Sequence, residues 1–96
     1  SKIPLIIPGF NKSVQLAKQL IDKGFYISLS HSIFKKEGID FNSLPIEKLF
    51  LETDNSESIL IEEVYQKAAD CFQIKEDDLK EKIYTNFTTL FNTHGR

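Results

Sequence analysis

Two carboxylates that follow a short apolar run are the residues whose spacing best suits chemistry. The run Leu49–Leu51 leads directly into Glu52, Thr53 and Asp54. A short apolar run bounded by turn residues is typical of a strand buried on both faces, and alternate side chains of a strand share a face. Glu52 and Asp54 are therefore expected together at the carboxyl end of a strand, where α/β proteins build their sites. A carboxylate there can bind a metal ion and deprotonate the water that the metal holds.

The same carboxylates also fit a purely structural role. Asp54 and Ser58 are suited to capping the helix expected after this strand, because short polar side chains are preferred at helix N-caps. Spacing alone leaves both roles open.

Other residues that can do chemistry are weaker candidates. His31 follows the second expected strand, where a histidine can act as a ligand or base, but an ordinary surface histidine is the simpler interpretation. Ser28 and Ser30 lack a paired histidine–carboxylate pattern that would make either one a nucleophile. Cys71 falls on the apolar face of an expected helix, which favours a buried structural thiol.

Composition and charge narrow the class of protein. The chain has 96 residues, which is enough for one domain, and its net charge of -2 with scattered lysines gives no basic patch that points to nucleic acid. Cys71 is the only cysteine, so no intramolecular disulfide is possible and a reducing, cytoplasmic location is expected. No apolar run approaches the roughly 20 residues of a membrane span and no secretory signal is present, so we expect no membrane partner.

The rest of the chain alternates apolar strands with amphipathic helices. The expected strands are Ile3–Ile7, ended by Pro8–Gly9, then Phe25–Ser30 and Leu49–Thr53. The expected helices are one capped by Asn11 or Ser13 and stopped by Gly24, a short one at His31–Glu37, one at Ile59–Phe72 and one from Glu76. A helical turn is expected near Ser43–Pro45, and a loose tail at Asn92–Arg96. The buried stripes of the last two helices are expected at Ile61, Val64, Tyr65, Ala68, Cys71 and Phe72, and at Leu79, Ile83, Phe87 and Leu90.

This alternation predicts an α/β fold of three parallel strand–helix units, with the strands adjacent in sequence order and joined by right-handed crossovers. Three parallel strands leave two open edges, so the chain is either a small open sheet or the last part of something larger. The apolar character of the strands favours the second alternative, because such strands expect cover on both faces. Open edges also predict self-association of the chain or packing against further polypeptide.

Four segments, taken in order, carry a family resemblance. They are Ile6–Ser13, Phe25–Ser28, Leu44–Asp54, and Asn86 with Leu90–Phe91. They resemble the His-x-Phe-x-Gly segment, the Tyr-Ile-Ser strand, the Pro-x-x-x-Leu-Leu-x-Glu-Thr-Asp segment and the Asn-x-x-x-Leu-Phe helix ending of the TatD family of metal-dependent hydrolases. By this resemblance, residues 1–96 form the last part of a TIM (βα)8 barrel.

The resemblance implies a hydrolase of phosphodiester bonds, typically in DNA, with a divalent metal site at the carboxyl ends of its strands. Asp54 matches the last-strand aspartate, which contacts metal and acts on the attacking water. Glu52 matches the adjacent glutamate and would orient its neighbours. No family motif places a ligand at His31.

Two departures from the family pattern bear on activity. Pro8 stands where the family has a metal-binding histidine, and Asn55 stands where a proline commonly follows the aspartate. The remaining family ligands belong to strands upstream of Ser1, which leaves Asp54 alone. One carboxylate does not hold a catalytic metal, so this chain is expected to bind metal weakly and to be inactive without the rest of its parent. A catalytically degenerate relative that serves as a scaffold or binding protein is the alternative, and Pro8 favours it.

Overall fold

The computed structural model describes residues 5–53 and 60–94 of the chain. The elements in chain order are strand β1 (Ile6–Phe10), helix α1 (Val14–Asp22), strand β2 (Tyr26–Ser30), the short 3-10 helices η1 (His31–Lys35), η2 (Phe41–Ser43) and η3 (Ile46–Lys48), strand β3 (Leu49–Glu52), helix α2 (Ile61–Phe72) and helix α3 (Glu76–His94). None of the helices in the described part of the chain is both long and apolar enough to cross a membrane.

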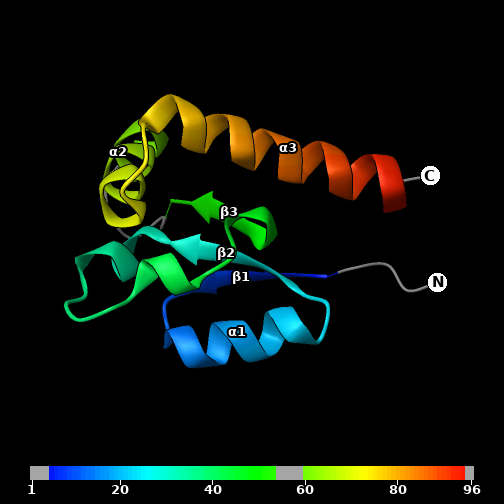
Figure 1. Cartoon of the computed structure of the whole chain (residues 1–96), viewed down its shortest axis with the longest axis horizontal. Helices are drawn as coiled ribbons and strands as arrows, with labels where there is room; N and C mark the ends of the chain where they lie inside the picture. Colours follow the sequence, from blue (N-terminus) through cyan, green and yellow to red (C-terminus); the bar gives the residue numbers. More distant parts are fainter. Residues whose placement is uncertain (1–4, 54–59, 95–96) are drawn as a thin grey trace.

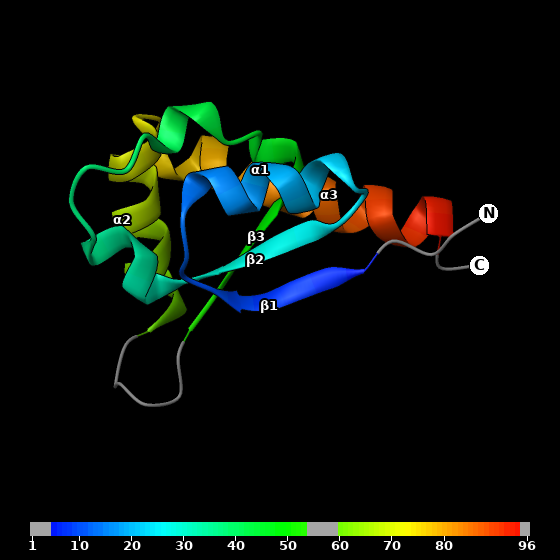
Figure 2. The ribbon, with the colours of Figure 1, turned by 90° about the horizontal axis from the view of Figure 1, so that it is seen from below.

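The three strands form one parallel sheet in the order β1-β2-β3, as the alternation of elements predicts. In Figure 1 the strands run side by side with all three arrowheads pointing left. Figure 2 shows that α1 and α3 lie on the same side of these strands. The α/β class and the parallel order are therefore confirmed.

The two faces of β2 differ in chemistry. Ile27 and Leu29 are fully buried in the apolar core, together with Leu49 of β3 and Ala17 of α1. The opposite face carries Tyr26, Ser28 and Ser30, which are also buried. The register pairs Ser28 with Phe50 and Ser30 with Glu52, so Glu52 lies on the polar face of the sheet.

Helix α1 begins and ends where its sequence predicts. Ser13 is the N-cap, and its hydroxyl accepts a hydrogen bond from the backbone N–H of Leu16 at 3.2 Å. The chain turns out of the helix at Gly24, whose φ of +100° is a conformation that glycine adopts without strain.

The expected end of the first strand is wrong. Pro8–Gly9 does not end β1, which continues to Phe10. The register with β2 shifts between Ile7 and Phe10, and Pro8 and Gly9 lie within this irregular stretch of the strand. Among the described strands β1 pairs only with β2, and proline is tolerated on such an edge strand.

The C-terminal helices also depart from expectation. Helix α3 continues through His94, so the expected loose tail is wrong for Asn92–His94. Within the expected stripes, Ile61 and Phe87 are exposed, whereas Ala69 is buried. A helix face is buried only where another element covers it, and sequence periodicity alone does not show which part of the face has a neighbour.

Candidate functional site

The carboxyl ends of the three strands meet at one edge of the sheet. Phe10 pairs with Leu29 near the end of β1, and Ser30 pairs with Glu52 at the ends of β2 and β3. Parallel strands bring their ends together in this way, and the edge so formed is the usual place for a site. The residues that follow β1 and β2 therefore lie at the same edge of the sheet as Glu52.

Glu52 joins the two outer strands across β2. Its Oε1 accepts a hydrogen bond from the backbone N–H of Gly9 at 2.8 Å. Gly9 has a φ of +61°, which places it in the left-handed region that strongly favours glycine. A Cβ at Gly9 would lie 4.0 Å from Glu52 Oε2, an ordinary contact, so backbone conformation rather than space demands the glycine. The expectation that Glu52 orients its neighbours stays a prediction, and its hydrogen bond to Gly9 is a contact through which it could do so.

A second group of polar contacts ties the loop after β1 to the loop after β2. Asn11 Nδ2 donates to Ser32 Oγ at 3.0 Å, and the hydroxyls of Ser32 and Ser30 are 3.2 Å apart. Lys36 Nζ donates to the backbone carbonyl of Asn11. These contacts hold one ammonium group and two hydroxyls at the carboxyl edge of the sheet.

His31 does not lie on the surface. It is fully buried at the start of η1, directly after β2, so the interpretation as a surface histidine is wrong. The cause is tertiary, because α2 packs against η1 and no feature of the local sequence shows that contact. A ligand role for His31 stays a prediction.

The remaining candidates are in structural settings. Ser28 and Ser30 are buried, and the neighbour recorded for Ser30 is Ser32 rather than a histidine. Cys71 is partly buried, with Sγ 4.0 Å from the carbonyl oxygen of Phe34. Burial raises the pKa of the Cys71 thiol, and the charge of Asp70 raises it further.

Asp54 lies outside the described residues, two positions after the last residue of β3. Its expected catalytic and metal-binding roles are therefore not placed by the geometry. Within residues 5–53 and 60–94, no group of three or more histidine, cysteine, aspartate or glutamate side chains is arranged to hold a metal ion. Pro8 has no ligand atom on its side chain. The described residues of this chain do not by themselves fit a metal centre.

One buried polar residue has a role that sequence reasoning missed. Asn86 of α3 is buried, and its Nδ2 donates to the carbonyl oxygens of Ile46 at 2.7 Å and Leu49 at 2.8 Å. It therefore fixes α3 to the start of β3, at the end of the strand away from Glu52. Its spacing from Ile83 and Leu90 places it on their stripe, which was the available signal.

The geometry defines an α/β protein of parallel strands whose carboxyl edge carries Glu52 and a group of hydroxyl, amide and ammonium groups. Residues 1–92 match the family model of the TatD related DNase, and the chain belongs to that family. A search of curated proteins finds no match to this chain. Family membership confirms the resemblance seen in the four sequence segments and supports a TatD-like hydrolase scaffold.

Proposed function

We propose that this chain is the C-terminal part of a TatD-like (βα)8 barrel that hydrolyses phosphodiester bonds, with DNA as the expected substrate. The observation that carries the proposal is the contact between Glu52 and Gly9, because it places a carboxylate across the ends of all three strands. This is the edge at which barrel enzymes bind and convert their substrates. Family membership over residues 1–92 supports the same conclusion.

The two carboxylates have different roles in this proposal. Glu52 is a positioning residue, since its carboxylate is engaged with the backbone of β1. Asp54 is the catalytic carboxylate, expected to bind metal and to act on the attacking water as its counterpart does in the family. The family is generally metal-dependent, and the described residues here do not form a metal centre. By the family resemblance, the further ligands belong to strands upstream of Ser1. The chain alone is accordingly expected to be inactive.

The location in the cell is part of the proposal. A single cysteine, which allows no intramolecular disulfide, is compatible with a reducing compartment, and we extend the proposal to the cytoplasm.

A second candidate function is a catalytically degenerate scaffold or binding protein. Pro8 favours it, because this residue replaces a ligand in the family pattern and lies within β1 beside Gly9. In that case Glu52 would still join β1 to β3, and only the chemistry would be lost.

A chimera separates the two candidates. This chain replaces the matching segment of an active family member, and hydrolysis of a small phosphodiester, bis(p-nitrophenyl) phosphate, is measured with divalent metal present. We expect weak activity with Pro8, stronger activity with Pro8→His, and none with Asp54→Asn. A folded Pro8→His chimera without activity would contradict the hydrolase proposal and support the scaffold.

A further inference from the structure

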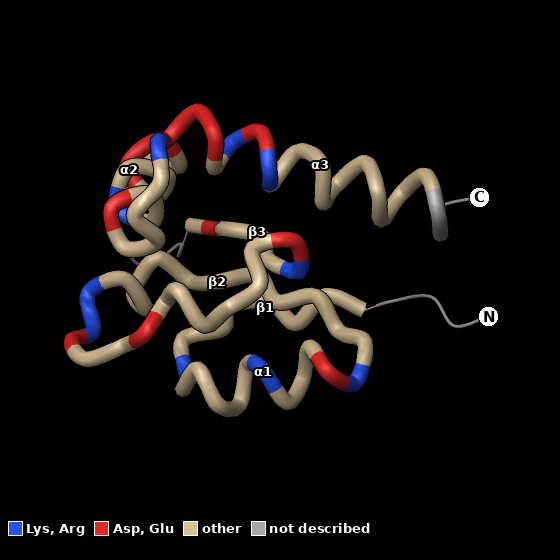
Figure 3. The backbone as a smooth tube through the Cα atoms, in the orientation of Figure 1, with Lys and Arg blue, Asp and Glu red and all other residues tan. Residues whose placement is uncertain are grey.

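The carboxyl edge of the sheet carries its charges in two halves. The segments that follow β1 and β2, residues 11–13 and 31–36, contain three lysines and no acidic residue. The β3 side carries Glu52 and, in the first turn of α2, Glu62 and Glu63. Figure 3 shows basic positions on the loops beyond β1 and β2, acidic positions further along the loop that follows β2, and both kinds of charge along α2. In a chain with a net charge of -2, residues 11–13 and 31–36 are therefore short basic stretches beside the candidate site.

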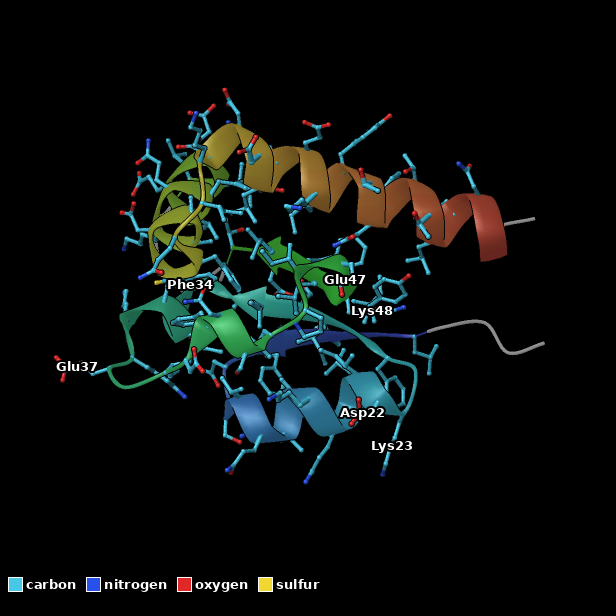
Figure 4. The ribbon with its side chains drawn as sticks, in the orientation of Figure 1. Asp22, Lys23, Phe34, Glu37, Glu47 and Lys48 are labelled. Atoms are coloured by element: carbon cyan, nitrogen blue, oxygen red, sulfur yellow. The ribbon has the colours of Figure 1, made fainter. Side chains whose placement is uncertain are left out.

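Lys36 is the cation that the structure fixes in place. It is exposed, yet its Nζ donates to the carbonyl oxygen of Asn11, a residue 25 positions earlier. Asn11 in turn donates to Ser32, so the ammonium group joins a network of contacts between the two loops. Lys12 is exposed in the same loop as Asn11. Glu37, the next residue after Lys36, points outward and away from the strands (Figure 4).

A fixed cation suits a phosphate ligand. Lysine binds phosphate as a point charge, and a side chain already held in position loses less conformational entropy when the ligand arrives. Carboxylates on the β3 side repel a phosphate unless a cation intervenes, whereas the β1–β2 side attracts it. A polyanionic strand that crosses this edge would therefore have flanking phosphates on the lysine side.

We propose that Lys12 and Lys36 contact backbone phosphates of a nucleic acid strand, next to the phosphodiester presented to Glu52 and Asp54. This inference rests on the proposed function and names the part of the site that holds the substrate. Phosphate contacts position a strand and carry no base information. These two lysines, which we call the phosphate rim, therefore bind without sequence preference. The scattered lysines of the sequence did not indicate this site. Lys36 approaches the loop that holds Lys12 only in the folded chain.

The test uses the whole 96-residue chain and a fluorescently labelled single-stranded DNA oligonucleotide, with binding followed by anisotropy at several salt concentrations. We expect weak, salt-dependent binding that Lys36→Gln and Lys12→Gln each reduce several-fold. Each substitution should lower the slope of log affinity against log salt by about 0.7 to 1, the value for one lost phosphate contact. Lys36→Arg should retain most of the binding, because the charge is kept.

Lys23→Gln is the matched control. Lys23 is an exposed lysine of the same α1 region but lies at the other end of the helix (Figure 4). It should leave both affinity and salt slope unchanged. A wild-type chain that does not bind the oligonucleotide at low salt would overturn the proposal, as would equal effects of Lys36→Gln and Lys23→Gln. If polyglutamate displaced the labelled oligonucleotide as well as unlabelled DNA does, the assignment of the ligand as phosphate would be overturned.

The same variants separate this inference from the function on which it rests. In the active-family chimera, Lys36→Gln should weaken DNA cleavage while hydrolysis of the small phosphodiester continues. Loss of both activities would place Lys36 in the scaffold rather than at a phosphate. Absence of hydrolysis in every folded chimera would contradict the proposed function, whereas unchanged DNA cleavage by Lys36→Gln would contradict only the phosphate rim.

Discussion

Glu52 accepts a hydrogen bond from the backbone N–H of Gly9 at 2.8 Å, and this contact links β3 to β1 across the strand that lies between them. Pro8 directly precedes the donor, and Asp54 lies two residues after the acceptor. The contact therefore fixes Gly9, the neighbour of Pro8, against the last residue of β3. It also secures the bulged end of β1, where the register with β2 is irregular.

Replacing Glu52 tests this link. Glu52→Ala should lower the free energy of unfolding by about 1 kcal/mol, the value for one hydrogen bond to a charged group that remains partly exposed. Glu52→Gln keeps an acceptor oxygen and should have a smaller effect. Urea denaturation at one protein concentration measures the difference, and hydrogen exchange reports on the Gly9 amide directly.

Glu47→Ala is the control for Glu52. Glu47 is an exposed glutamate near the opposite end of β3 (Figure 4). It should leave stability and the exchange of the Gly9 amide unchanged. Unchanged exchange of that amide in Glu52→Ala would show that the hydrogen bond does not persist in solution.

Asn86 should be the most sensitive polar residue in the helices. Its amide satisfies two backbone carbonyls, and Asn86→Leu removes both hydrogen bonds at a buried position. We expect a loss of about 2 kcal/mol, because two side-chain hydrogen bonds disappear at a buried position, although the carbonyl of Ile46 still accepts from the backbone N–H of Leu49. Asn86→Asp should be worse, since a carboxylate would face two carbonyl oxygens. Thermal and urea unfolding would measure both, with exposed Thr85→Ala as the neutral comparison.

Alkaline pH should weaken the fold in two stages. Burial raises the pKa of Cys71 above its ordinary value of 9.0, with Asp70 adding to the effect, and burial raises the pKa of Tyr65 above 10.0 despite an opposing effect of Lys80. The unfolded chain therefore loses these protons first. The stability contributed by each neutral group is complete below its ordinary pKa and is lost as pH rises through the raised value.

Single substitutions assign the two stages. Cys71→Ser should remove the loss that begins near pH 9, and Tyr65→Phe the loss that begins near pH 10. Both effects should be small, because the side chains are partly exposed. Labelling with a thiol reagent at pH 8 offers a second measurement: Cys71 should react more slowly in the folded chain than in urea. Faster labelling in the folded chain would contradict the raised pKa.

The strands and their order were accessible to sequence reasoning because each strand is a short apolar run between turn residues, and crossover rules allow few topologies. The position at which β1 ends was not accessible in this way. Pro8–Gly9 is a strong local turn signal, but an edge strand with a bulge accommodates it. Local signals do not show which strand will be at an edge.

The site was only partly predictable for a related reason. Alternation within β3 predicted Glu52 and Asp54 on one face, and Asp54 lies outside the described residues. The pairing of Glu52 with Ser30 came from the register of the sheet, which the sequence did not predict. The burial of His31 and the approach of Lys36 to Asn11 depend on residues distant in sequence, and no periodic pattern encodes such contacts. Asn86 was visible in the family-like helix ending and as a polar interruption of an apolar stripe, but its two carbonyl partners lie 40 and 37 residues away.

The exposed apolar residues beside the sheet edges predict self-association. Leu5 and Ile6 are exposed at the β1 edge, and a groove of about 500 Å³ beside β3 is lined in part by Phe50, Ile61 and Phe87. Among the described strands β3 pairs only with β2. Burying such a surface is favourable, so we expect the isolated chain to associate in dilute solution.

Sedimentation velocity tests the association. Phe87→Glu and Ile6→Lys should shift the chain toward monomer, whereas Thr89→Glu, at another exposed position of α3, should not. A wild-type monomer with cooperative unfolding would show that these 96 residues form a self-sufficient core. Association unaffected by Phe87→Glu would place the contact elsewhere.

Metal binding is the last prediction. The family is generally metal-dependent, but Pro8 supplies no ligand, and one carboxylate at Asp54 provides too few donors for a preorganised site. We therefore predict no tight binding of Mg²⁺, Mn²⁺ or Zn²⁺ by this chain, with any weak binding abolished by Asp54→Asn. Calorimetric titration with each ion measures this. Submicromolar binding that disappears in Asp54→Asn would contradict the prediction and would mean that other groups, His31 first among them, complete the site.

The Pro8→His substitution separates a missing ligand from a misplaced one. In this chain it should strengthen metal binding only slightly, because two ligands remain too few. In a full-length parent that carries the upstream ligands, the same substitution should strengthen the binding of one metal ion clearly. The bulge between Ile7 and Phe10 makes this a strict test, since it determines where the residue 8 side chain is directed. If Pro8→His has no effect in the parent, residue 8 does not occupy the ligand position, and the match of β1 to the family's histidine segment is wrong.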